Sequence, residues 1–368
     1  MESSRLSGFF ERTREAKQIV VVDLGFLGDT LHVVPALWEV KRHYPNAAIH
    51  VLSTPVGSDV LRLAPCVDRA WSVVLDPAKR TLRDQLNLIQ AMRREKFDLA
   101  FNFSGADRAT ILAALSGARW RVAHMGGRKH FWNRWLIGNW VPRQDPDLTL
   151  FEQRRQVLAA CGFELGPPRF DLKVDEESQA WAAKIVPEGT VHLSINSNNP
   201  LKEWPLQHYA SLLKTVWQNL PEVQVMASGN NKDRERARLK QLLAAVNDPR
   251  FQLLPDNMSI AQLAGVLKRC RLHVGSDSGV MHLAVALGVP TISFFRDQKG
   301  HKSWLPHGPD HQTLVVSCTC IDHHAAPCQA SDRAECLVRL EPQQVAQIVC
   351  RRLNSPSLFA PSVHGSTG

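Results

Sequence analysis

The stretch "QIVVVDLGFLGDTLHVVPAL", residues 18–37, reads as a buried strand, a glycine-containing turn and the start of a helix. Its apolar run is continuous, as expected of a strand in a parallel sheet that is covered on both faces. The same succession returns along the chain, where strand-like segments such as residues 46–54 and 97–105 alternate with helical patterns. This alternation predicts an α/β fold built on parallel sheets.

The chain of 368 residues is long enough for two such domains. A break rich in glycine and proline, "CGFELGPPRFDL" at residues 161–172, divides two runs of strands and helices. We expect one domain over residues 1–165, a second over residues 166–353 and a disordered tail over residues 354–368. The amphipathic stretch at residues 341–353 is expected to pack back across both domains. Ligands should bind between the domains, at the carboxyl ends of the strands.

Charge and composition narrow the class of protein. The formal net charge is +9, and residues 1–150 hold 21 Lys and Arg against 15 Asp and Glu. This excess favours an anionic partner, although an ordinary basic bias would produce it too. No apolar run approaches the ~20 residues of a membrane span, and residues 1–17 lack the apolar core of a signal peptide. We expect a cytoplasmic location, where cysteines are thiols or metal ligands more often than disulfides.

Two classes of function lack their usual signals. The turn after the first strand offers Gly25 and Gly28 but no G-x-G-x-x-G, which weighs against a nicotinamide oxidoreductase. The chain also lacks a known RNA- or DNA-binding motif, which weighs against a nucleic-acid-binding protein.

The same turn places Asp29 at the start of the first helix, at the expected ligand edge. Asp29 could be a general base that takes a proton from an acceptor hydroxyl. It could equally be a helix N-cap, a position that aspartate favours. His32, one turn later, either orients Asp29 or contacts substrate, or it simply packs on the helix.

The stretch "HVGSDSGVMHLAVALGVP", residues 273–290, predicts an anion site at a strand-to-helix turn. Free N–H groups and the helix dipole favour phosphate there, although Asp277 or Ser278 could only cap the helix. His282 follows one turn later and is either a ligand or a core residue. Lys202 lies in a loop before a helix, where it could balance a diphosphate leaving group or be solvated.

Three stretches together, at residues 28–37, 201–205 and 275–295, resemble the bacterial heptosyltransferases of lipopolysaccharide core assembly, glycosyltransferase family 9. The resemblance implies the GT-B fold, with two Rossmann-like domains facing a cleft. The N-terminal domain would bind the acceptor and the C-terminal domain the nucleotide sugar. It also implies inverting transfer of a heptose from ADP-heptose to the lipopolysaccharide inner core, without metal or other cofactor. A member that glycosylates a protein or uses another nucleotide sugar is the alternative.

The resemblance also implies roles for individual residues. Asp29 would be the catalytic base, and Lys202 would pair with the diphosphate. The nucleotide sugar would be bound by Gly28, Asp277, Ser278, Gly279 and His282. Where members of the family often carry an acid for the ribose, near residues 229–233, this chain reads "GNNKD", so that contact stays unassigned.

A basic segment at residues 119–140 is the candidate acceptor site. It contains no acid, and four tryptophans are interleaved with its cations Arg119, Arg121, Arg128, Lys129 and Arg134. Cations match the carboxylates and phosphates of the lipopolysaccharide core. Tryptophan favours the boundary between apolar and polar phases, so the segment could also rest on the inner membrane surface. A solvated basic face with core tryptophans is the other interpretation. The oligomeric state stays open.

Four cysteines near the C-terminus form a second candidate site, this one for a metal. They are Cys318, Cys320, Cys328 and Cys336, with two histidines close by in the sequence. Such a set could bind zinc or iron, although its spacing is not a standard zinc pattern. The alternative is free thiols in an ordered loop.

Overall fold

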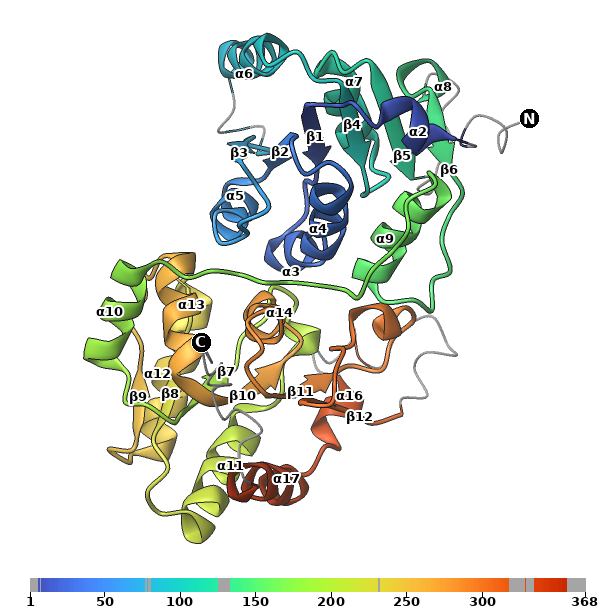
Figure 1. The fold of residues 1–368 in the computed structure, drawn as a ribbon. Coiled ribbons are helices and arrows are strands. Elements are labelled where there is room, and N and C mark those ends of the chain that lie inside the picture. The colour runs from blue at the N-terminus through green and yellow to red at the C-terminus, as the bar shows by residue number, and fades with distance from the viewer. Residues whose placement is uncertain are drawn as a thin grey trace, which may run out of the picture.

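The computed structural model describes residues 6, 8–76, 78, 81–124, 133–230, 232–317, 328 and 334–355, without the side chains of residues 133 and 134. These residues form two six-stranded sheets, in the orders β3-β2-β1-β4-β5-β6 and β12-β11-β10-β7-β8-β9. Every strand pairing is parallel. The predicted α/β class with two parallel-sheet units is confirmed, and Figure 1 shows one unit above the other.

The first unit contains six strands and the helices that connect them. Its strands are β1 (Gln18–Val22), β2 (Ala48–Ser53), β3 (Arg69–Ser72), β4 (Leu99–Asn102), β5 (Trp120–His124) and β6 (Asn139–Val141). Its helices are α2 (Phe9–Thr13), α3 (Leu27–Leu31), α4 (Val34–His43), α5 (Pro55–Leu61), α6 (Leu82–Arg94), α7 (Asp107–Leu115), α8 (Asn133–Leu136) and α9 (Leu150–Ala160).

The second unit repeats this plan. Its strands are β7 (Thr190–Ser194), β8 (Val225–Ala227), β9 (Phe251–Leu253), β10 (Cys270–Ser276), β11 (Thr291–Phe295) and β12 (His311–Val315). Its helices are α10 (Glu176–Ile185), α11 (Leu206–Asn219), α12 (Asp233–Val246), α13 (Ile260–Arg269), α14 (Gly279–Ala286), α16 (Glu335–Val338) and α17 (Pro342–Asn354), with 3₁₀ turns η1 (Pro200–Lys202) and η2 (His301–Trp304).

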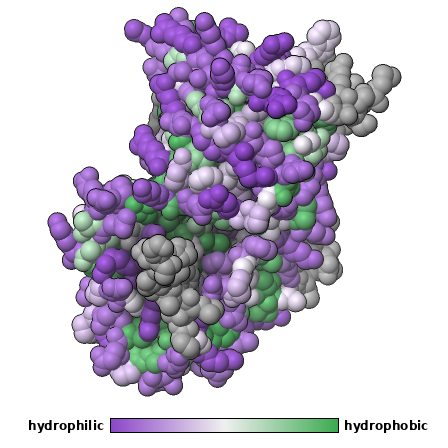
Figure 2. Space-filling view, in the orientation of Figure 1, coloured by the Kyte–Doolittle hydropathy of each residue, from purple (hydrophilic) through white to green (hydrophobic). Residues whose placement is uncertain are grey.

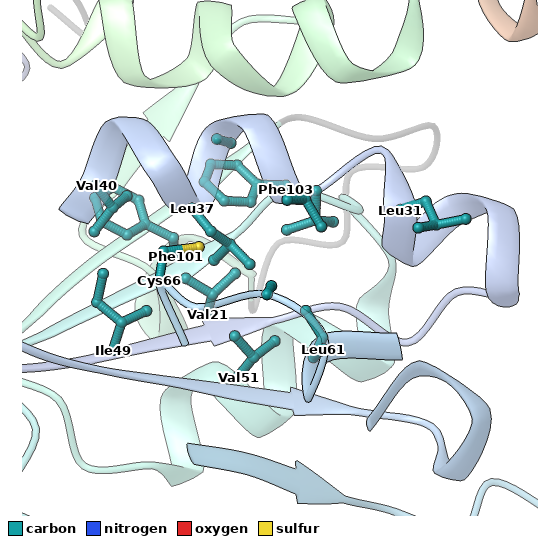
Figure 3. Close-up of a cluster of buried hydrophobic side chains, with 14 of the residues drawn as sticks. Val21, Leu31, Leu37, Val40, Ile49, Val51, Leu61, Cys66, Phe101 and Phe103 are labelled. Carbon is teal, nitrogen blue, oxygen red and sulfur yellow. The ribbon is translucent and has the colours of Figure 1, made fainter. Parts of the chain in front are cut away.

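The continuous apolar run of β1 serves two cores at once. Ile19 and Val21 face one side of the sheet, in a cluster with α4, whereas Val20 and Val22 face the other side. Figure 3 shows the first cluster, where Val21 lies among side chains of α4, β2 and β4. Because successive strand residues point to opposite faces, a strand covered on both sides needs apolar residues at every position.

The C-terminal helix α17 does not cross back over both units. It packs against α11 in the second unit, and Figure 1 shows the two helices side by side. Its apolar face, which includes Val345 and Val349, belongs to the core of that unit. The predicted crossing was therefore wrong. The chain crosses from the first unit to the second between α9, which packs on α4, and α10, which packs on α13.

The two units meet through more than the connecting chain. Leu263 of α13 and Leu283 of α14 belong to the same buried cluster as the core of the first unit. Most of the face in Figure 2 is hydrophilic, and hydrophobic side chains show near the junction of the units. Within the described residues, no helix has the length and apolar content needed to cross a membrane. Residues 356–368 of the expected tail lie outside the described part.

Candidate active site

Asp29 lies on α3, which begins just beyond the carboxyl end of β1. Asp29 is the third residue of α3 and not its N-cap, which is Phe26. Its Oδ2 accepts a hydrogen bond from the Phe26 backbone N–H at 3.0 Å, so the carboxylate still stabilises the helix N-terminus. Its other oxygen, Oδ1, accepts no hydrogen bond from the described residues, and the side chain is only half-buried. The helix-capping role and a role as base are therefore compatible, since each uses a different oxygen.

Lys202 and His282 both contact the carboxylate of Asp277. Lys202 Nζ lies 2.7 Å from Oδ2, and His282 Nε2 lies 3.5 Å from Oδ1. Burial alone would raise the pKa of the Asp277 carboxyl, but His282 and Lys202 outweigh it and lower that pKa from its ordinary value. The site therefore holds an ionised carboxylate between a lysine and an imidazole.

Asp277 and Ser278 connect β10 to α14. Ser278 is the N-cap of that helix, because its Oγ accepts from the Met281 N–H at 3.4 Å. The cap leaves the N–H groups of Gly279 and Val280 unused by side chains of the described residues. These N–H groups in the first turn favour an anion, so the start of α14 can still bind the phosphate predicted for this turn.

Two glycines let α3 and α14 pack against each other across the junction, where Figure 1 shows the two helices facing one another. A Cβ at Gly28 would lie 3.0 Å from Cδ2 of His282, and a Cβ at Gly279 would lie 2.6 Å from Cδ2 of Leu27. The resemblance assigns both glycines to the nucleotide-sugar site, and that role stays a prediction. What the structure shows is that side chains of the opposite unit occupy the place that a Cβ would take at either glycine.

Gly279→Ala should lower turnover about 10-fold or more, because α3 must move away and even small misplacement of reacting groups is costly. ADP affinity, measured by calorimetry, should change far less. Gly138→Ala is the matched control, since a Cβ at Gly138 meets nothing within 4 Å. A loss of ADP affinity as large as the loss of turnover would mean that Gly279 mainly makes room for the nucleotide.

His32 is buried where α3 ends, and it pairs with His282 instead of Asp29. Its Nε2 lies 3.3 Å from Nδ1 of His282, and its ring stacks on Phe151 of α9. Burial and the neighbouring His282 hold the pKa of His32 well below its ordinary value, so its imidazole is neutral.

Sequence reasoning missed Trp304, which lies among Lys202, His32 and His282. Its ring centroid is 5.8 Å from Lys202 Nζ and 5.6 Å from the ring centroids of both His32 and His282. It is also 3.6 Å from the place of a Cβ on Gly28. Its surroundings in the sequence carry no motif that would have identified it.

Sequence reasoning also missed Asp23, which directly follows the apolar residues of β1. The residue is fully buried, accepts from Thr30 Oγ1 at 2.9 Å and lies 3.7 Å from the guanidinium of Arg154. Burial raises the pKa of its carboxyl, while Arg154 and Thr30 counteract the rise. Since Thr30 follows Asp29 directly, this network fixes the helix that carries Asp29.

The structure does not bring all the candidate acceptor residues to Asp29. Arg119 and Arg121 lie at the amino-terminal end of β5, whereas Asp29 follows the carboxyl end of β1 in the same parallel sheet. The Arg121 guanidinium donates to the backbone carbonyls of Ala118 and Leu136, which gives it a structural role. The described parts of residues 119–140 form β5, α8 and β6, so the segment is not one continuous basic face.

Arg128 and Lys129 lie outside the described residues, and so does the side chain of Arg134 on α8. Arg143 is a cation that the sequence interpretation did not include. It is exposed just beyond the carboxyl end of β6, at the same edge of the sheet as Asp29.

The cysteine cluster is only partly described, because Cys318 and Cys320 lie outside the described residues. Cys328 and Cys336 are both buried in the apolar core of the second unit. Among the residues with a described position, no group of three His, Cys, Asp or Glu side chains could hold a metal. The described residues do not test the cluster as a whole, so free thiols and the alternative of a metal site both stay predictions.

Comparisons with known proteins agree with the resemblance of the motifs. The family model of glycosyltransferase family 9 (heptosyltransferase) matches residues 85–335. Lipopolysaccharide heptosyltransferase 3 of Escherichia coli is 24% identical over 290 residues, which cover 76% of this chain and 84% of the relative.

Solved structures support the fold. The glycosyl transferase family 9 protein from Veillonella parvula superposes with a TM-score of 0.78 at 18% identity, covering 92% of this chain and 97% of its own. E. coli heptosyltransferase WaaC, solved with ADP, gives a TM-score of 0.74 at 15% identity, covering 91% and 99%. The predicted GT-B architecture is thereby confirmed.

Proposed function

Because the chain belongs to glycosyltransferase family 9, we propose that it moves a heptose from ADP-heptose to the anionic inner core of lipopolysaccharide, with inversion and without a metal. The names of the similar proteins, which are lipopolysaccharide heptosyltransferases, support this donor and acceptor. Since such an acceptor is anchored in a membrane, the proposal includes a cytoplasmic enzyme that works at the inner face of the inner membrane.

One observation carries the proposal. An unbroken series of contacts links Lys202, Asp277, His282 and His32, and His32 ends the helix on which Asp29 lies. A cation suited to a leaving diphosphate and a carboxylate suited to a proton acceptor thus belong to one connected group, although they come from different units of the fold.

The proposed mechanism is a single displacement. Asp29 Oδ1 takes the proton of an acceptor hydroxyl while that oxygen attacks the anomeric carbon of the heptose. The bond from this carbon to the phosphate oxygen breaks, and ADP leaves with the electron pair. Lys202 and the free N–H groups at the start of α14 stabilise the growing negative charge. A direct attack of this kind needs no covalent intermediate on the protein.

Asp233 is the candidate for the ribose contact that the sequence left unassigned. It lies in the first turn of α12, after the carboxyl end of β8, and its side chain is fully exposed. The strands β8, β7 and β10 are neighbours in the sheet. A nucleotide whose phosphates lie at α14 could therefore extend across β7 toward Asp233, where a carboxylate suits ribose hydroxyls.

For the acceptor, we propose that Arg128, Lys129 and Arg134, together with Arg143 at the carboxyl edge of the first sheet, bind its carboxylates and phosphates. Replacing Arg128, Lys129 and Arg134 together with Gln should raise the acceptor KM and weaken binding to anionic vesicles, without changing donor hydrolysis in the absence of acceptor. Arg119→Gln is the control, because that residue precedes β5 and lies at the edge of the sheet remote from Asp29. Wild-type acceptor KM and vesicle binding in the triple variant would exclude this segment as the acceptor site.

The stereochemistry of the product tests the mechanism. NMR of the heptosylated core should show the newly formed anomeric centre in the configuration opposite to that of the ADP-heptose supplied. Retention of configuration would contradict a single displacement assisted by Asp29.

A further inference from the structure

The junction between the two units contains a direct hydrogen bond between side chains of α14 and the end of α3. His32 Nε2 and His282 Nδ1 are 3.3 Å apart, and both residues are buried, with exposures of 6% and 5%. The rings of Phe151 and Trp304 pack on His32 and leave the imidazole little freedom to turn. The pair therefore has one preferred geometry when α3 and α14 are in contact.

The neighbours of the pair determine where its protons lie. His282 Nε2 faces the ionised Asp277 carboxylate and has no closer partner, so a proton on Nε2 is favourable and a lone pair there would be repelled. Its other ring nitrogen, Nδ1, is the atom that meets His32.

Of the two ring nitrogens of His32, only Nε2 has a partner among the described side chains, and that partner is His282. The two rings therefore share one hydrogen bond, while His282 Nε2 lies in a 3.5 Å electrostatic contact with the Asp277 carboxylate. Asp277 also accepts from Lys202, so the series of contacts starts beside Asp29 and ends at the proposed diphosphate contact.

We propose that His32 and His282 are positioning residues. They hold α3, the helix that carries the proposed base Asp29, in a fixed position relative to the Lys202–Asp277 pair. This inference rests on the proposed function, in which Asp29 must meet an acceptor at the sugar that Lys202 helps to hold. His32 lies three residues after Asp29, and its backbone N–H donates to the Gly28 carbonyl within the same turn. Without the hydrogen bond between His32 and His282, this turn of α3 can shift relative to α14. Asp29 then loses its alignment with the sugar that Lys202 helps to hold.

Two substitutions of His32 separate hydrogen bonding from packing. His32→Phe keeps an aromatic ring against Phe151 but cannot form the hydrogen bond, whereas His32→Gln keeps a side-chain amide, which can donate or accept, near the position of Nε2. We expect His32→Phe to lower kcat about 10-fold or more, since alignment is lost, while ADP affinity changes by less than about 3-fold. His32→Gln should recover most of the kcat. His43→Phe, at a half-buried histidine on α4, controls for the exchange of the ring itself.

A double variant tests whether the two histidines act as one unit. His32→Phe combined with His282→Phe should be no slower than the slower single variant, because the bond can be lost only once. Fully additive losses, or equal kcat in His32→Phe and His32→Gln, would overturn the proposal and leave the histidines as packing residues.

Nitrogen NMR of protein with ¹⁵N-labelled histidine provides a readout that does not depend on turnover. His32 should be neutral, and its Nε2 signal should shift in His282→Phe because the hydrogen bond between the rings is lost. The single variants assign the signals. A charged His32, or an Nε2 signal of His32 that does not change in His282→Phe, would overturn the proposed bond. The wild-type transfer assay separates the two ideas: if it fails, the proposed function is wrong, but the NMR result still decides the bonding of the pair.

Discussion

Asp29→Asn should lower turnover by about 10²-fold or more, while ADP affinity measured by calorimetry stays near the wild-type value. The amide oxygen of asparagine can still accept from the Phe26 N–H, which the carboxylate now binds at 3.0 Å, so the start of α3 is preserved. What the variant lacks is a group that can take the acceptor proton. The loss should therefore appear in kcat, with little change in thermal stability.

Asp29→Ala is the matched comparison, because it removes both the proton acceptor and the helix cap. It should be as slow as Asp29→Asn but less stable, by about 1 kcal/mol for the lost cap. If Asp29→Asn turns over at the wild-type rate and only Asp29→Ala is impaired, Asp29 is a helix cap and the base is another residue.

Lys202→Ala should weaken ADP binding and lower turnover by about 10²-fold, equivalent to ~3 kcal/mol of barrier, because the leaving diphosphate loses its cation. Calorimetry with ADP and initial rates with the donor measure the two effects. Lys302→Ala is the control, since Lys302 is an exposed lysine in the nearby turn η2. Unchanged ADP affinity in Lys202→Ala would exclude the diphosphate contact.

A second variant separates this contact from the balance of charge at Asp277. Removing Lys202 leaves the buried Asp277 carboxylate facing only His282, and its unpaired charge could by itself repel ADP. Adding Asp277→Asn to Lys202→Ala removes that charge. ADP binding should remain weak if Lys202 contacts the diphosphate, and full recovery would mean that the lysine only neutralised Asp277.

The central strands were predictable from the sequence because each is buried on both faces. The run at residues 18–22 is apolar at every position for this reason. The strands β5, β6, β9 and β12 were not singled out. β6, β9 and β12 lie at sheet edges, and β6 and β9 contain only three residues each. β12 is also largely half-exposed. Partial exposure removes the continuous apolar pattern on which the prediction depends.

The candidate site was predictable in its parts but not in its contacts. Glycines and acids at strand-to-helix turns pointed to Asp29 and Asp277, since parallel strands bring such turns to one edge. That the junction would place His282 against Gly28, or Trp304 beside Lys202, depends on how two separate units pack. Such contacts leave no periodic signal within either segment.

The basic segment shows a different limit of sequence reasoning. Clustered cations predicted an acceptor site, but their spacing could not say at which end of a strand each would lie. Arg119 and Arg121 precede or begin β5 and so lie at the edge remote from Asp29. Arg143 stands alone in the sequence, yet it follows β6 at the edge where the proposed chemistry occurs.

The most direct test of the account is mass spectrometry of the products formed from ADP-heptose and a set of truncated lipopolysaccharides. We predict that at least one core lacking a heptose gains the mass of a single heptose, that ADP is released in equal amount, and that Asp29→Asn forms this product at about 10²-fold lower rate. No transfer to any of these cores by a wild-type protein that binds ADP would contradict the proposed acceptor and reaction.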